Sequence, residues 1–172
     1  MSPDIFIEDF ERTENSDYLH GVIGRSLIVA TRFDAMCTAL LKAIEIKTGA
    51  VYLLASDEDF DQFVTQAETK YRTLNSSINS FELPDQISDI LHQARKARNE
   101  VAHSLTKGLE GCIDTKISND SLIDEVSGLL AKIVDGDIIS SVLISNFNDE
   151  PILNNVSLEG YKDKIINWVV EQ

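Results

Sequence analysis

Residues 27–44 read LIVATRFDAMCTALLKAI, and their apolar side chains recur at intervals of three and four residues. Because an α-helix has about 3.6 residues per turn, this spacing predicts one helix with a single buried stripe. The pattern extends the helix to about Leu19–Lys47, and Gly49 stands where a C-terminal cap is expected. The stripe consists of Leu27, Ala30, Phe33, Cys37, Leu40 and Ile44.

A second helix is predicted to follow this one. Ser56 and Asp59 have the spacing of a capping box, and the apolar residues after them keep a helical period as far as Ile78. We therefore expect one unbroken helix up to Ile78. The short apolar run 51–55 could form a strand, but nothing nearby would pair with it.

Two further helices are predicted in the middle of the chain. Pro84 suits the first position of a third helix, which Gly108 would end. A fourth helix is expected to begin near Asn119. The sequence leaves open whether Gly136 breaks it, so that residues 119–146 form one helix or two.

The two ends of the chain complete the prediction. Residues 157–172 have the pattern of a C-terminal helix capped by Ser157, and the acidic residues 1–16 are expected to form an arm or a short helix. Short connections favour antiparallel neighbours. Residues 1–172 therefore predict a single all-α domain, an antiparallel bundle of four to five main helices.

Composition excludes several classes of protein. The chain has 29 acidic and 15 basic residues, and its net charge of −14 opposes general capture of nucleic acid or anionic membrane. No apolar run is long enough for a membrane helix and the N-terminus is acidic, so we expect a cytoplasmic protein that does not bind a membrane. Two cysteines and three histidines show no metal-binding spacing, and neither a metal nor a cofactor is expected.

The predicted third helix departs from the acidic background. Residues 91–107, LHQARKARNEVAHSLTK, have four basic residues and one acidic residue. Arg95, Lys96 and Lys107 are therefore expected to attract an anionic substrate, with a solvated helix face as the alternative. Polar residues also occur here at positions where a core helix would be apolar.

Three polar residues of this helix form a candidate site. Asn99 and His103 are four residues apart and share a face, whereas Arg98 and His103 are about 140° and about 7.5 Å apart. One helix cannot direct both Arg98 and His103 at the same small group of atoms. Two such helices across a two-fold axis could do so, and this predicts a homodimer formed through the third helix.

Residues 98–103, RNEVAH, resemble the R-N-x-x-x-H form of the Arg-x4-6-His motif of the HEPN superfamily. The resemblance extends over residues 23–143 as architecture. It implies a metal-independent endoribonuclease that acts as a homodimer in a toxin-antitoxin or phage-defence setting, with RNA as substrate and an antitoxin or another protein as partner. The family also has inactive members, so the alternative is a HEPN-like module for dimerisation or partner-protein binding. Leu105 stands where toxins that are modified by their antitoxin have a tyrosine, and that regulation is not expected.

The resemblance implies that Arg98, His103 and Asn99 are catalytic. Histidine titrates near neutral pH, so His103 suits proton transfer, and the planar guanidinium of Arg98 suits phosphate oxygens. Asn99 could orient the histidine or bind the RNA backbone. A carboxylate from an earlier helix often contacts this motif in active members, and Asp34 or Glu45 could supply it.

Overall fold

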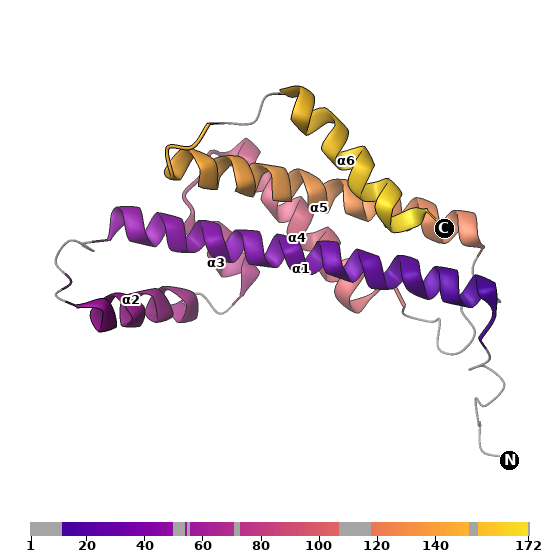
Figure 1. The fold of residues 1–172 in the computed structure, drawn as a ribbon, viewed down its shortest axis with the longest axis horizontal. Helices are drawn as coiled ribbons and strands as arrows, with labels where there is room; N and C mark the ends of the chain where they lie inside the picture. Colours follow the sequence, from indigo (N-terminus) through magenta and orange to yellow (C-terminus); the bar gives the residue numbers. More distant parts are fainter. Residues whose placement is uncertain are drawn as a thin grey trace, which may run out of the picture.

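A computed structural model describes residues 12–49, 54, 56–70, 73–106, 118–151 and 155–171. Within these residues the chain forms helices and no strands, which confirms the all-α prediction (Figure 1). The helices are α1 (Glu14–Thr48), α2 (Asp57–Lys70), α3 (Leu74–Ser80), α4 (Asp85–His103), α5 (Asn119–Phe147) and α6 (Asn155–Val170).

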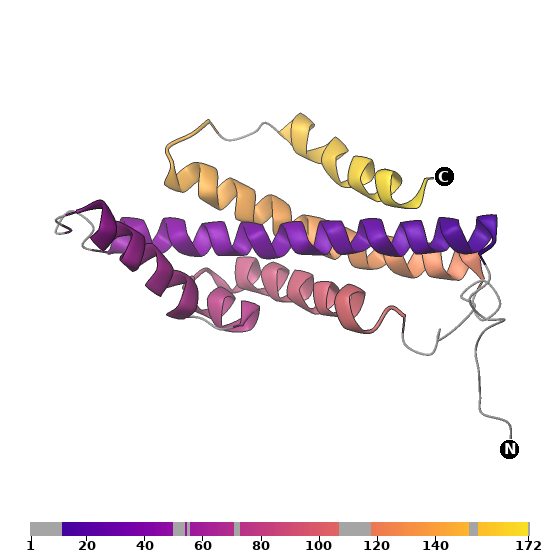
Figure 2. The same ribbon diagram turned by 60° about the horizontal axis from the view of Figure 1, so that its bottom comes forward.

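The long helices α1 and α5 lie side by side and run in the same direction. At one end of the pair, Asn15 of α1 hydrogen-bonds Asn119 of α5. At the other end, Nζ of Lys47 lies 3.7 Å from Oδ2 of Asp149. Helix α4 packs antiparallel to α5, and α6 covers α5 in the antiparallel sense as well. Figure 2 shows α3 and α4 on one side of α1 and α6 on the other.

The core lies where α1, α4 and α5 meet, and it includes Ala30, Phe33, Cys37 and Leu40 of the predicted stripe. Phe33 of α1, Leu91 of α4 and Leu130 of α5 are fully buried. Burying side chains of this size contributes about 1.5–3 kcal/mol each. Leu27, by contrast, belonged to the predicted stripe, but its side chain is exposed, with a relative accessibility of 39%. The neighbouring Ile28 is exposed as well, at 59%.

Helix α5 is one 29-residue helix, which answers the question that the sequence left open. Gly136 does not break it, because this glycine is buried at a close approach of three helices. A Cβ atom there would lie 2.5 Å from the Cβ of Ala94 in α4 and 2.7 Å from Cε2 of Phe33 in α1. The absence of a side chain therefore lets these helices approach one another closely.

The prediction of one unbroken helix from Ser56 to Ile78 was wrong. Ser56 does cap α2, since its hydroxyl accepts the amide of Asp59 at 3.1 Å. A new helix, α3, starts at Leu74, because Thr73 is extended and forms a reciprocal capping box with Ser76. The apolar period continues across this break, but the capping pair Thr73 and Ser76 starts a separate helix there.

Several predicted helix ends moved by one to a few residues. Helix α1 begins at Glu14 after a Thr13 cap, so residues 14–16 belong to it and not to an arm. Helix α6 begins at Asn155, and Ser157 is therefore inside the helix and not its cap. Gly49 does follow α1 as its C-terminal cap, as predicted.

Two other predicted boundaries concern α4 and the segment before α2. Pro84 is the residue before α4 and not its first member, and α4 ends at His103. Residues 1–11, Gly108 and, except for residue 54, the run 51–55 lie outside the described residues.

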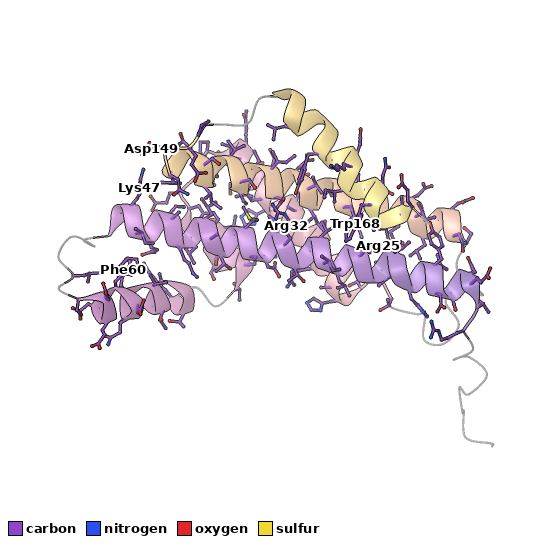
Figure 3. The ribbon with its side chains drawn as sticks, viewed as in Figure 1. Arg25, Arg32, Lys47, Phe60, Asp149 and Trp168 are labelled. Carbon is purple, nitrogen blue, oxygen red and sulfur yellow. The ribbon has the colours of Figure 1, made fainter. Side chains whose placement is uncertain are left out.

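Helix α6 is fixed to α1 at its C-terminal end. The Arg25 guanidinium donates from Nε to the carbonyl of Val169 at 2.8 Å, and the Tyr18 hydroxyl donates to the carbonyl of Val170 at 2.5 Å. These bonds satisfy carbonyls that a helix end leaves unpaired. Figure 3 shows Arg25 and Trp168 close to this end of α6. Among the described residues, no helix has the length and apolarity needed to cross a membrane.

Candidate functional site

A cleft of about 590 Å³ lies between α1, the α3 region and α4. Three residues of the predicted motif region face it from α4, opposite a single acidic residue from α1. The remaining lining groups are mostly hydroxyls and amides. The lining residues are Asp34, Cys37, Thr38, Thr73, Leu74, Asn75, Ser77, Arg95, Arg98 and Asn99.

Arg98 is held firmly in this cleft by Asp34. Its Nε atom donates to both carboxylate oxygens of Asp34, at 2.9 and 2.8 Å, and its Nη2 atom also donates to Oδ2. Its Nη1 atom donates to Oδ1 of Asn99 at 3.2 Å. The side chains of Arg98 and Asp34 are 26% and 31% exposed, so the pair is half-buried at the wall of the cleft. The contact orients the guanidinium and compensates its charge.

The two candidate carboxylates of the first helix have different partners. Asp34 contacts Arg98, as one of the two alternatives predicted. Glu45 lies about three turns further along α1 and accepts from the ammonium of Lys70 in α2 at 3.0 Å. Only Asp34 is therefore in contact with the motif.

The predicted anion-attracting residues lie on different faces of α4. Arg95 lines the cleft with Arg98 and Asn99. Lys96 lines a separate hollow of about 320 Å³, where α4 meets Leu129 and Lys132 of α5. Adjacent residues of a helix point about 100° apart, which accounts for this separation. Lys107 lies outside the described residues.

His103 is the last residue of α4 and is exposed. It is not one of the residues that line the cleft, and within the described part of the chain it has no hydrogen-bond partner. A single chain thus brings Arg98 and Asn99 together and leaves His103 about 7.5 Å further along the helix axis from Arg98.

Sequence reasoning missed the contribution of α3 to this region. Thr73, Asn75 and Ser77 line the cleft, and Asn79 hydrogen-bonds Nε2 of His92 at 3.0 Å. The capping pair that starts α3 was the available signal. The pKa of His92 is lowered from 6.5 by burial, and further by the charges of Arg95 and Lys96.

Other reactive groups near the cleft have limited chemistry. Burial raises the pKa of Cys37 to about 12, so its thiol stays protonated and is a poor nucleophile. No cluster of three or more histidine, cysteine or acidic side chains in the described ranges is arranged to hold a metal ion. The side chains that line the cleft offer guanidinium, carboxylate, amide and hydroxyl groups.

Comparison of the chain with protein-family models, with curated proteins and with solved structures gave no match. The resemblance to the HEPN superfamily therefore rests on residues 98–103 and on the helical setting.

Proposed function

We propose that the chain is a HEPN-like, metal-independent endoribonuclease that acts as a cytoplasmic homodimer in a toxin-antitoxin or phage-defence setting. The observation that supports this most strongly is the cleft itself. Arg98 and Asn99 line an open hollow next to a second cation, Arg95. Asp34 fixes the orientation of Arg98, which in turn donates to Asn99. A preoriented guanidinium in a partly buried site suits the charge that develops on a reacting phosphate.

The reaction proposed for this site uses the nucleophile of RNA itself. The 2′-hydroxyl attacks the adjacent phosphorus as His103 takes its proton, and the bond from phosphorus to the 5′-oxygen breaks. The protonated His103 then returns a proton to the 5′-oxygen, so the products are a 2′,3′-cyclic phosphate and a 5′-hydroxyl. Arg98 would stabilise the phosphorane and Asn99 would orient the backbone.

The homodimer supplies what one chain lacks. On α4 the exposed residues recur every three or four positions and form one outward polar stripe, which ends at His103. A two-fold axis near the His103 end of this stripe would bring the partner's His103 toward the cleft of the first chain. The stripe consists of Gln86, Asp89, Gln93, Lys96, Glu100 and His103.

A second candidate function is a non-enzymatic HEPN-like module that dimerises or binds a partner protein such as an antitoxin. Two observations favour it. Asp34 already compensates the charge of Arg98, and the net charge of −14 suits a basic partner. The open cleft and the exposed His103 favour the nuclease.

The test compares RNA cleavage in EDTA by the wild type, Arg98→Ala and His103→Ala. The chain offers matched controls. Arg12 is also paired with an aspartate, Asp17, through two of its nitrogens, and His20 is also an exposed histidine. We expect loss of cyclic-phosphate product in the two motif variants and full activity in Arg12→Ala and His20→Ala. Equal activity in all five proteins, or none in any, argues against the nuclease and leaves the binding module.

A further inference from the structure

The two arginines of the cleft differ in how much of their charge and how many of their N–H groups are already used within the protein. Arg98 uses Nε, Nη1 and Nη2 for bonds to Asp34 and Asn99. Its charge is compensated at contact distance. Among the residues that line the cleft in the described structure, Asp34 is the one acid, and both of its oxygens accept from Arg98.

Arg95 is uncompensated in the same cleft. Its Nε atom is buried and has no hydrogen-bond partner among the described residues, and none of their carboxylates forms an ion pair with it. A buried N–H group without an acceptor costs free energy, and a guanidinium without a counter-charge costs more. An anion in the cleft would supply both the acceptor and the charge.

Some neutral side chains that line the cleft already use their hydrogen-bond donors within the protein, so they are not free to bind an anion beside Arg95. The hydroxyls of Thr38 and Ser77 donate to backbone carbonyls of their own helices or caps. Asn99 accepts from Arg98 through Oδ1, which leaves its Nδ2 group as a donor without a described partner. Among the lining residues of the described structure, the donors left for a ligand include Arg95, the amides of Asn75 and Asn99 and the remaining N–H groups of Arg98, and the positive charge of Arg95 is the one without a bound carboxylate.

We infer that Arg95 is the residue that holds a backbone phosphate of a single-stranded nucleic acid in the cleft. This inference rests on the proposed function, because the reaction needs the RNA backbone at Asn99 and Arg98. The positive charge that attracts the phosphate comes from Arg95, since Asp34 has already compensated Arg98. An arginine can present two parallel N–H groups to phosphate oxygens, which a lysine cannot.

His92 lies one turn before Arg95 on α4 and provides a reporter of the charge at Arg95. The positive charge of Arg95 is one of the causes that lower the pKa of His92, after burial. A phosphate bound at Arg95 would offset that charge, so the pKa of His92 should rise when the anion binds. Nuclear magnetic resonance of the histidine ring can follow this change through a pH titration.

The experiment titrates inorganic phosphate, and separately a single-stranded 2′-deoxy oligonucleotide that lacks the attacking hydroxyl, into the wild type and two variants. Arg95→Gln and Lys96→Gln remove the same charge from adjacent positions of α4, one inside the cleft and one outside it. We expect about a tenfold loss of affinity in Arg95→Gln, the size of one charge-assisted contact, and less than about twofold in Lys96→Gln. The pKa of His92 should rise on binding in the wild type and in Lys96→Gln.

Arg95→Lys guards against a folding defect. It keeps the charge and should bind with intermediate affinity while its thermal transition matches that of the wild type. The inference is overturned if Arg95→Gln binds as the wild type does, if Lys96→Gln loses as much affinity, or if the wild type binds neither probe.

Phosphate binding at Arg95 and RNA cleavage by His103 are measured separately, so either proposal can fail while the other holds. Binding that depends on Arg95, without cleavage of RNA, supports the phosphate site and removes the proposed reaction. Cleavage that depends on His103, with binding indifferent to Arg95, keeps the reaction and removes Arg95 as the phosphate-binding residue.

Discussion

Gly136 offers the most direct test of how the three central helices pack. In Gly136→Ala the new Cβ would lie 2.5 Å from the Cβ of Ala94 and 2.7 Å from Cε2 of Phe33. Carbon atoms in contact prefer about 3.5–4.0 Å, so a separation of about 1 Å is needed. A Cβ atom cannot rotate away, and α4 and α5 must therefore move apart.

The size of the effect follows from two opposing contributions. Alanine is better than glycine in a helix by about 1 kcal/mol, whereas overpacking a core costs about 1–3 kcal/mol. Since both contacts fall below 3.0 Å and one of them is Cβ to Cβ, we expect the upper part of that range. The net result for Gly136→Ala is a loss of about 1–2 kcal/mol in the free energy of unfolding.

Gly128 is the matched control, because it lies in the same helix and a Cβ atom added there would have nothing within 4 Å. Gly128→Ala should stabilise the protein by about 0.5–1 kcal/mol. Urea denaturation followed by circular dichroism measures both variants, provided that the slopes with denaturant agree. If Gly136→Ala is as stable as Gly128→Ala, the result contradicts the close packing of α4 against α5 at Gly136.

Three other predictions concern the cleft and its neighbours. A double-mutant cycle of Asp34→Ala and Arg98→Ala should give a coupling of about 1 kcal/mol in urea denaturation, because the pair is half-buried and Arg98 donates to Asp34 from two nitrogens; additive effects would contradict the pairing. The pKa of His92 is lowered from 6.5 in the folded chain, so its contribution to stability is present above pH 6.5 and is lost as the pH falls below it. Denaturation at pH 7.5 and at pH 5 should therefore show a smaller acid-induced loss in His92→Gln than in the wild type, and equal losses would refute the assignment. In a Cys112→Ser chain, burial and a pKa of about 12 should keep Cys37 from reacting with a thiol reagent at pH 8 until the protein unfolds, whereas stoichiometric reaction of the folded protein would show that the thiol is accessible.

Local sequence patterns were sufficient to predict most of the helices. The stripe around Phe33 and the apolar positions of α4 and α5 are set by a period that does not depend on distant residues. The break before α3 was also encoded locally, in the pair Thr73 and Ser76, but the continuing apolar period outweighed it in the prediction.

The composition of the candidate site could be predicted only in part. Arg98, Asn99 and His103 are recognisable from their spacing on one helix. That spacing could not choose between Asp34 and Glu45, because contact with Arg98 spans 64 positions of the chain and depends on how α1 lies against α4.

The sequence by itself determined that this protein is helical and that residues 91–107 carry a local excess of basic residues in an acidic chain, since periodicity and charge are local properties. Only the tertiary structure decided how those basic residues divide. Packing of α4 against α1 and α5 turns Arg95 into the cleft, leaves Lys96 outside it and joins Arg98 to Asp34. The physical reason is that burial and charge compensation depend on neighbours far apart in sequence, at separations that Gly136 allows by having no side chain.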